Sequence, residues 1–310
     1  MRRLARLASC RSPGTGGRNA DLQASRTPLG EYLRARRALI SPEDVGLPIA
    51  SRRRVAGLRR DEVAQLADVS AGYYLRLEQG HDSRPSAQVL QALSRALQLD
   101  ASAFEYMSRL VQIQTNGRRP MKKESLTPQT QASIHALFSQ WKHTPAYLMD
   151  GNQDVLMSND LARAMAPGAL EPGVNLPLLV FSEGWRAADP DWEDTAVRTA
   201  ATLRHGSDPT DPRLHEIVGQ LYLRNADFRR LWARHDARPH YVGPIDQVIA
   251  PFGAVSLTCQ TLIVPGTEGH VLVVFHAEPG TVAATAIDSL RERVTDSHPA
   301  AESIRMQSVA

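Results

Sequence analysis

Residues 58–80 read LRRDEVAQLADVSAGYYLRLEQG, and this stretch decides the fold of the N-terminal part of the chain. Two short helices that cross steeply need a small residue where they touch, apolar anchors on both helices and a tight turn between them. Ala64 supplies the small residue, and Val69 anchors the turn. Tyr74 and Leu77 are the apolar anchors of the second helix. The stretch therefore predicts a helix-turn-helix, with an ordinary helical hairpin as the alternative.

The second helix of this pair is expected to face a nucleic acid. Ser70 stands where a capping residue is wanted, and the first N–H groups of a helix can also meet a phosphate. A helix in the major groove reads base edges with its outward side chains. Arg76 is the strongest candidate reader, because its planar fork can pair with O6 and N7 of guanine; the alternative is a solvated surface arginine. The remaining outward residues are Ala71, Gly72 and Tyr73.

Other polar residues around the pair are predicted to contact the DNA backbone. Arg60, near the start of the first helix, is predicted to clamp a phosphate rather than to read a base. Arg84 and Ser86 follow the second helix and are predicted backbone contacts, with solvated loop residues as the alternative. The upstream arginine run is predicted to follow phosphate or to enter the minor groove, with simple solvation as the alternative. It comprises Arg52, Arg53 and Arg54.

Helical signals lie on both sides of the pair. Thr27 can cap a helix, Pro28 suits a first helical position, and apolar spacing continues to Ile40. Two further helices are predicted around 89–97 and 101–114. Five short helices in this length predict a compact all-α domain over residues 27–116. Residues 117–126 are then a polar linker, and residues 1–26, rich in Gly, Ser and Arg, are predicted to be a disordered basic arm.

Residues 127–280 predict a second domain of mixed helix and strand. Two short strands, 145–149 and 153–157, flank Asp150-Gly151-Asn152, which is hairpin-turn chemistry. Helices are predicted at 128–142, 191–204, 211–223 and 225–235, and strands at 245–250, 254–264 and 270–276. This order suggests one antiparallel sheet with helices packed on it, an α+β domain. Residues 281–310 are predicted to be a weakly ordered tail, either a weak helix or disordered.

Charge divides the chain at the same place. Of the 310 residues, 42% are hydrophobic and 22% charged, so a buried core is possible and wholesale disorder is not expected. Residues 1–120 carry a net charge of +9, and residues 121–310 a net charge of −6. A basic first part and an acidic remainder suit a nucleic-acid module joined to a domain that does other work.

The cysteines and the hydropathy pattern bear on location. The two cysteines, Cys10 and Cys259, make neither a disulfide framework nor a zinc site, and they fit a reducing cytosol. Residues 7–10 look like a lipoprotein cleavage box, but arginines leave no apolar stretch before it. No apolar run approaches the length that crosses a bilayer. We therefore expect a cytoplasmic protein that does not contact a membrane.

An enzyme is not expected. His215-Glu216 begins like the helix of a zinc protease, but Gly219 stands where the second histidine must be. The chain has no nucleophile elbow, phosphate loop or dinucleotide fingerprint, and its ten histidines lack ligand spacing. We therefore expect neither catalysis nor a metal or cofactor.

These motifs resemble the Xre-type helix-turn-helix regulators, which are akin to lambda repressor and Cro, in a subgroup with an MmyB-like C-terminal ligand-binding domain. The resemblance spans about residues 28–280 and rests on the runs at 29–37, 41–48, 58–64, 73–80, 85–90, 189–193 and 228–236. It implies a lambda-repressor-like N-terminal domain and a PAS-like second domain that holds a small apolar ligand such as a fatty acid.

Two residues depart from the family pattern. Asp68 stands in the tight turn where glycine is usual, and aspartate is among the few other residues that tolerate a left-handed conformation. Ser158 precedes Asn159 where a Trp-Asn pair is usual, which leaves one wall of the expected pocket open to question.

Large aromatic residues and one polar helix end are the candidates for the ligand site. Aromatic residues belong first of all in cores, so plain packing is the alternative for each of them. An arginine or histidine within 234–236 can meet a ligand carboxylate, with a helix-end surface network as the alternative. The candidates are Trp141, Tyr147, Trp185, Trp192, Phe228, Trp232, Arg234 and His235.

The expected partners follow from these assignments. Double-stranded DNA is the first, and a homodimer is expected because two half-sites multiply affinity and match palindromic operators. The second domain is expected to bind a small apolar ligand, with a protein partner as the alternative. An enclosed apolar cavity favours the ligand, and an exposed apolar patch favours the partner.

Overall fold

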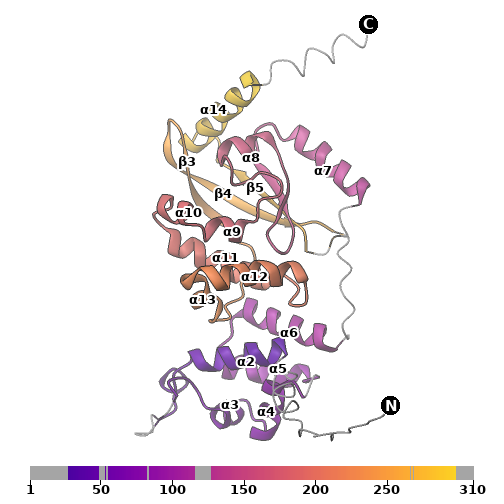
Figure 1. The fold of residues 1–310 in the computed structure, drawn as a ribbon, viewed down its shortest axis with the longest axis vertical. Helices are drawn as coiled ribbons and strands as arrows, with labels where there is room; N and C mark the ends of the chain where they lie inside the picture. The colour runs from indigo at the N-terminus through magenta and orange to yellow at the C-terminus, as the bar shows by residue number, and fades with distance from the viewer. Residues whose placement is uncertain are drawn as a thin grey trace, which may run out of the picture. The chain divides into compact units, whose positions relative to one another are not determined.

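A computed structural model describes residues 27–48, 53, 55–81, 84–115, 127–265, 267 and 269–297. The chain divides into two compact units, one of residues 1–98 with 107–116 and one of residues 99–106 with 117–310 (Figure 1). The predicted arm at 1–26 and the predicted linker at 117–126 lie outside the described residues.

The first unit is helical, as expected. Its described residues form four whole α-helices, one short 3-10 helix and the second part of a fifth α-helix, whose residues 101–106 are grouped with the other unit: α2 (Pro28–Leu39), η1 (Glu43–Val45), α3 (Arg60–Leu66), α4 (Ala71–Gln79), α5 (Ala87–Ala96) and α6 (Ala101–Thr115). Thr27 caps α2, since its Oγ1 accepts a hydrogen bond from Gly30 N at 3.2 Å. Three of the four anchors that define a helix-turn-helix are buried, namely Ala64, Tyr74 and Leu77. The predicted all-α domain is confirmed.

The turn between α3 and α4 has the conformation that the sequence requires. Asp68 has a φ of +52°, the left-handed region in which glycine is usual and aspartate tolerated. Val69 N donates to Ala64 O at 2.9 Å and closes the turn on α3. Asp68 therefore adopts the left-handed conformation for which glycine is usual in this turn.

The second unit is built on one antiparallel sheet. Its strands are β1 (Ala146–Met149), β2 (Val155–Ser158), β3 (Gly243–Ile249), β4 (Gly253–Ile263) and β5 (Val271–His276). Their order is β2-β1-β5-β4-β3, so β1 pairs with both the next strand and the last one, Ala146 facing Val274. The predicted α+β domain with an antiparallel sheet is confirmed, and six helices separate its second and third strands.

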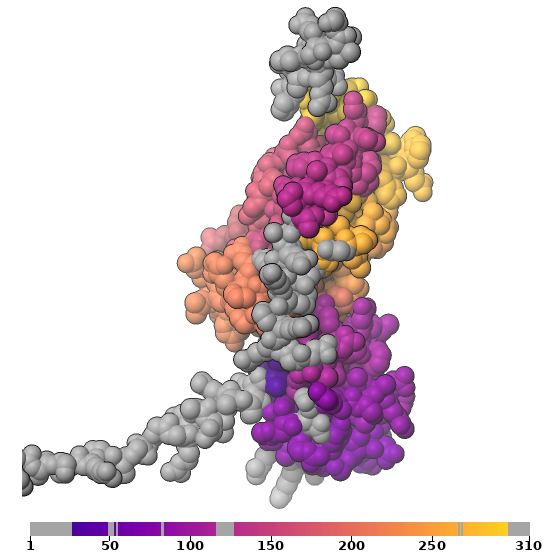
Figure 2. Space-filling view, turned by 90° about the vertical axis from the view of Figure 1, so that its right-hand side faces the viewer, coloured from indigo at the N-terminus to yellow at the C-terminus, as the bar shows by residue number. Residues whose placement is uncertain are grey.

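Helices cover both faces of this sheet. The helices of the unit are α7 (Pro128–Gln140), α8 (Asp160–Met165), α9 (Leu176–Val180), α10 (Glu183–Ala188), α11 (Trp192–Gly206), α12 (Pro212–Arg224), α13 (Ala226–Trp232) and α14 (Val282–Ser297). Ile134 and Phe138 of α7 pack with the sheet face that carries Leu148 and Leu272, and Figure 2 shows α7 on the surface of the unit. Helices α8 and α14 pack on the opposite face, and α9–α13 form a third apolar cluster.

The C-terminal end of this unit differs from the prediction. Residues 281–310 were expected to be weakly ordered, but 282–297 form helix α14. Its Ala283, Ala286, Ile287 and Leu290 are buried in the sheet core, at the i, i+3, i+4, i+7 spacing of an amphipathic helix. Alanines make half of that stripe, so the apolar signal is weak in the sequence. The short helices α8, α9 and α10 were not predicted either.

The turn between β1 and β2 is buried rather than exposed. Asp154 accepts two hydrogen bonds from Arg213, its Oδ2 from Nε at 2.9 Å and its Oδ1 from Nη2 at 2.8 Å. Asn152 Nδ2 donates to Asp211 Oδ2 at 2.6 Å, and Gln153 Nε2 donates to Thr199 O at 3.1 Å. The predicted hairpin therefore joins the sheet to helices α11 and α12 through polar contacts. Within the described ranges no helix is both long and apolar enough to cross a membrane.

Candidate nucleic-acid interface and ligand site

Helix α4 begins and ends at defined residues. Ser70 Oγ accepts a hydrogen bond from Tyr73 N at 3.1 Å, which caps the first turn. Gly80 ends the helix in a left-handed conformation, with a φ of +75°. Between them, Tyr74 and Leu77 are buried, while Ala71 and Gly72 are exposed. Arg76 is exposed and Tyr73 half-buried, so the four predicted outward residues share the side of α4 that faces away from the core.

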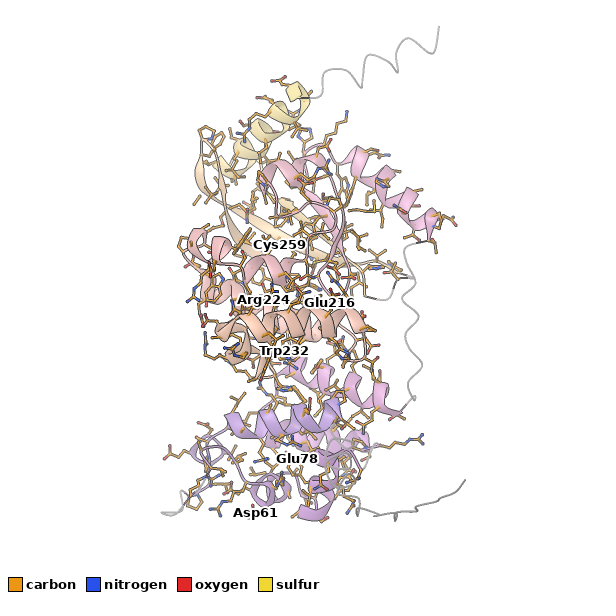
Figure 3. All side chains as sticks on the ribbon, in the orientation of Figure 1. Asp61, Glu78, Glu216, Arg224, Trp232 and Cys259 are labelled. Atoms are coloured by element: carbon orange, nitrogen blue, oxygen red, sulfur yellow. The ribbon has the colours of Figure 1, made fainter. Side chains whose placement is uncertain are left out.

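A buried carboxylate ties three helices together behind this face. Glu78 of α4 is fully buried, and its Oε1 accepts a hydrogen bond from Nε of Arg37 on α2 at 2.6 Å. Its Oε2 accepts one from Nε of Arg60 on α3, also at 2.6 Å. Figure 3 places Glu78 among these helices and Asp61 at their outer edge. Burial raises the pKa of the Glu78 carboxyl, but the two arginines outweigh it, so that the pKa lies below its ordinary value of 4.5.

The side chain of Arg60 is partly exposed to solvent. Its side chain is 48% exposed although Nε is bound to Glu78. A phosphate clamp needs a fixed guanidinium with donors still facing outward, and this arrangement provides both. Contact between Arg60 and phosphate stays a prediction.

Arg53 is hydrogen-bonded within the first unit. Its Nη1 and Nη2 donate to the two carboxylate oxygens of Glu62 at 2.7 Å, and Nη2 donates to Gly57 O at 2.6 Å. The side chain is only 9% exposed and holds the loop before α3; a DNA contact from Arg53 stays a prediction. The sequence does not reveal this role, because a run of three arginines looks the same whether it is exposed or bound within the fold. Arg52 and Arg54 lie outside the described residues.

The two candidates after α4 have different surroundings. Ser86 Oγ accepts a hydrogen bond from Val89 N at 3.3 Å and so caps α5. Arg84 is exposed. A capping hydroxyl can still touch a phosphate through the exposed helix end, and an exposed arginine can pair with one directly. Both contacts stay predictions.

The predicted ligand residues do not converge on one site. Trp141 packs beside Phe138 under α7, their ring centroids 6.3 Å apart. Tyr147 stacks on Phe275 on the opposite face of the sheet, at 6.2 Å. Three others belong to the cluster of α9–α13, namely Trp192, Phe228 and Trp232. Figure 3 shows Trp232 on α13 and Cys259 on β4, in different parts of the unit.

Trp185 and the polar helix end complete the set. Trp185 packs against both the sheet cluster and the α9–α13 cluster, and its buried Nε1 has no hydrogen-bond partner among the described residues. Arg234 pairs with Asp236 at 2.9 Å, and His235 Nδ1 lies 3.2 Å from Nη1 of Arg204. Arg204 in turn lies 3.7 Å above the ring of Trp232. Arg234 and His235 therefore take part in a polar network at the end of the helix.

An apolar groove lies elsewhere in the second unit. It has a volume of about 300 Å³ and lies where α8, α14 and the end of β3 meet. Arg293 is the charged residue of its lining, which otherwise consists of Ala164, Met165, Pro167, Val248, Ile249, Ala250 and Leu290. None of the eight predicted ligand residues lines it. Large aromatic residues do not indicate this groove, because its walls are aliphatic and because the sequence predicts a weakly ordered tail at α14.

Comparison with protein-family models gives two matches. A model described as a helix-turn-helix domain matches residues 28–106, and the MmyB-like transcription regulator ligand binding domain matches residues 130–290. No curated protein matches the chain. A helix-turn-helix followed by such a domain defines the class, a DNA-binding transcription regulator with a ligand-binding domain. The chain belongs to the family of the MmyB-like transcription regulator ligand binding domain, whose model covers more than half of it.

Proposed function

We propose that this regulator reads a specific DNA sequence through α4 and changes its activity when a small amphipathic acid binds the second unit. The observation that carries the proposal is the exposed face of α4, which presents Arg76 beside Tyr73 on a helix capped by Ser70. Base-reading helices insert their N-terminal turns into the major groove in this way. We propose the cytoplasm as its place of action, as expected for a DNA-binding regulator with two cysteines far apart in sequence.

Phosphate contacts would supply most of the affinity. Arg60 precedes α4 in the sequence and Arg84 follows it. Arg84 is exposed, and the side chain of Arg60 is 48% exposed. The first 120 residues carry a net charge of +9. Each neutralised phosphate releases counterions, so affinity should fall as salt rises. A homodimer on a palindromic operator fits this mode of binding, because each copy then reads one half-site.

The groove at α8, α14 and β3 is our proposed ligand site. Its volume of about 300 Å³ lies at the lower end of small-molecule pockets. Its aliphatic walls suit an acyl chain, which gains about 0.8 kcal/mol for each buried methylene. Arg293 is exposed at this groove and can pair with a carboxylate. A fatty acid is the simplest molecule with both features.

Two measurements on the full chain test these assignments. Binding-site selection from a random duplex library should return one sequence, bound with an affinity that falls steeply between two salt concentrations. Saturated fatty acids of increasing length should raise the melting temperature, since binding to the folded state alone stabilises it. Arg293→Ala should abolish that rise, whereas Arg234→Ala, at the helix end first considered, should keep it. Absence of sequence preference would overturn the DNA assignment, and absence of any thermal shift would overturn the ligand assignment.

A protein partner is the second candidate for the second unit. Tyr222 and Leu223, next to each other at the end of α12, are 50% and 82% exposed. Adjacent exposed apolar side chains are common at protein interfaces. If this surface binds a protein, the wild-type chain should form a complex in size-exclusion chromatography, and Leu223→Lys should disrupt that complex. The same change should leave unchanged the rise in melting temperature that fatty acids cause.

A further inference from the structure

Gly72 has no backbone reason to be glycine. Its φ lies outside the left-handed region, where glycine is favoured, and no core atom approaches it. The one heavy atom near its missing β-carbon is Nη1 of Arg76, at 3.9 Å from where that β-carbon would be. Glycine is also among the poorest residues for a helix. A β-carbon would fit here at ordinary contact distance, whereas a longer side chain would meet the guanidinium of Arg76.

The geometry of α4 explains the contact. Helical side chains lean toward the N-terminus, so residue 76 covers the turn that contains residue 72. The guanidinium of Arg76 lies over that turn, in space that a side chain longer than that of alanine would fill. Tyr73 stands beside it, with the guanidinium carbon 5.6 Å from the ring centroid, within the range of a cation–π contact. The glycine leaves the space, and the ring supports the guanidinium at one side.

We propose that Gly72 and Tyr73 are specificity-determining residues that fix the base step read by Arg76. This inference rests on the proposed function of α4 as the reading helix, and it adds which two neighbouring bases the helix reads. Arg76 pairs with O6 and N7 of a guanine, and the Tyr73 ring packs on the 5-methyl group of a thymine in the neighbouring base pair. A guanidinium and a ring 5.6 Å apart can contact adjacent base pairs at the same time. The operator half-site then contains adjacent thymine and guanine.

Binding-site selection with the full chain and matched variants tests this. Gly72→Leu fills the space over the turn and should lower the preference for the guanine by about tenfold, within the range of a bidentate arginine–guanine pair. Gly72→Ala adds a carbon at ordinary contact distance and should keep the preference. Tyr73→Ala should lose the preference for the adjacent thymine alone, and Tyr73→Phe should retain it. Melting curves and binding to non-specific DNA check that each variant is folded.

The outcomes separate this inference from the proposed function. If the wild-type chain selects no sequence at all, α4 is not a reading helix and both ideas are wrong. If the wild-type chain selects a site and Gly72→Leu selects the same guanine as strongly, the positioning role of Gly72 is wrong while the DNA assignment stands. If Tyr73→Ala changes no neighbouring base preference, the role of Tyr73 is wrong. Loss of guanine with Gly72→Leu and of thymine with Tyr73→Ala supports the proposal.

Discussion

The backbone oxygen of Glu78 lies so close to Gly30 that a β-carbon on residue 30 would stand 2.3 Å from it. Helices α2 and α4 therefore touch backbone to backbone at this point. The same oxygen accepts a hydrogen bond from Nη2 of Arg34 at 3.3 Å, so it cannot move away without losing that contact. This contact sets the distance between the first helix of the unit and the helix proposed to read DNA.

Gly30→Ala should therefore destabilise the first unit. A carbon forced into a packed backbone contact shifts both helices, and overpacking of this kind costs about 3 kcal/mol. Urea unfolding followed by circular dichroism measures the loss. Gly72→Ala is the matched control in the same unit, because it meets only Arg76 Nη1 at 3.9 Å. It should stabilise by about 0.5–1 kcal/mol, as alanine does in exposed helices. Equal effects of the two changes would contradict the close contact.

The Glu78 carboxylate should make the stability of the first unit depend on acid pH. Its pKa in the folded protein is lower than its ordinary value of 4.5, so the ionised form stabilises the fold above that pH. This stability is lost as the pH falls through the lowered pKa. Glu78→Gln should remove that part of the pH dependence and cost about 3 kcal/mol at pH 7, because two arginines lose their partner. Unfolding free energies of the wild-type chain and of Glu78→Gln, measured from pH 7 to pH 3, test this. If the two free energies change in parallel with pH, the prediction is wrong.

Arg53 and Arg84 should respond differently to replacement by alanine. Arg53→Ala breaks the pair with Glu62 and the bond to Gly57 O, so the melting temperature should fall. DNA affinity of the folded protein and its dependence on salt should stay the same. Arg84→Ala should leave the melting temperature unchanged and make the salt slope shallower by about one unit. Melting curves and mobility shifts at several salt concentrations test both. A shallower slope for Arg53→Ala would return that arginine to the DNA contacts.

Arg76 and Arg60 should separate base reading from phosphate binding. Arg76→Ala should cost about 1–3 kcal/mol on the selected operator and spare non-specific DNA, because only the operator offers the guanine. Arg60→Ala should weaken binding to both, since phosphates are present everywhere. Titration of each variant on operator and scrambled duplex measures this. Equal losses on both duplexes would make Arg76 a phosphate contact.

Local patterns made most of the first unit predictable. Ser70, Ala64 and Asp68 each have a role that depends on neighbours a few residues away, and the structure gives them the expected cap, packing and turn. The partner of Arg53 also lies nearby, but an exposed arginine run and an internal clamp have the same sequence pattern. Only the folded positions of the loop and α3 distinguish them.

Long-range packing made the second unit harder to predict. Trp141, Tyr147 and Trp232 all read as large apolar residues, and nothing local says that they belong to three different clusters. Helix α14 has the spacing of a buried helix, but alanines give that spacing little weight. The groove lined by Arg293 and Val248 combines segments that lie far apart in the sequence. Its existence depends on how the last helix packs on the sheet.

The position of β5 in the sheet affects the order in which a growing chain can fold. Ala146 of β1 pairs with Val274 of β5, so the middle of the sheet stays incomplete until the chain has been synthesised as far as β5. All residues matched by the helix-turn-helix model leave the ribosome long before that. A product terminated before residue 271 would thus contain the proposed DNA-reading helix, but its second unit would lack β5, the strand that completes the sheet. Such a truncated regulator would occupy operators with no means of responding to a ligand.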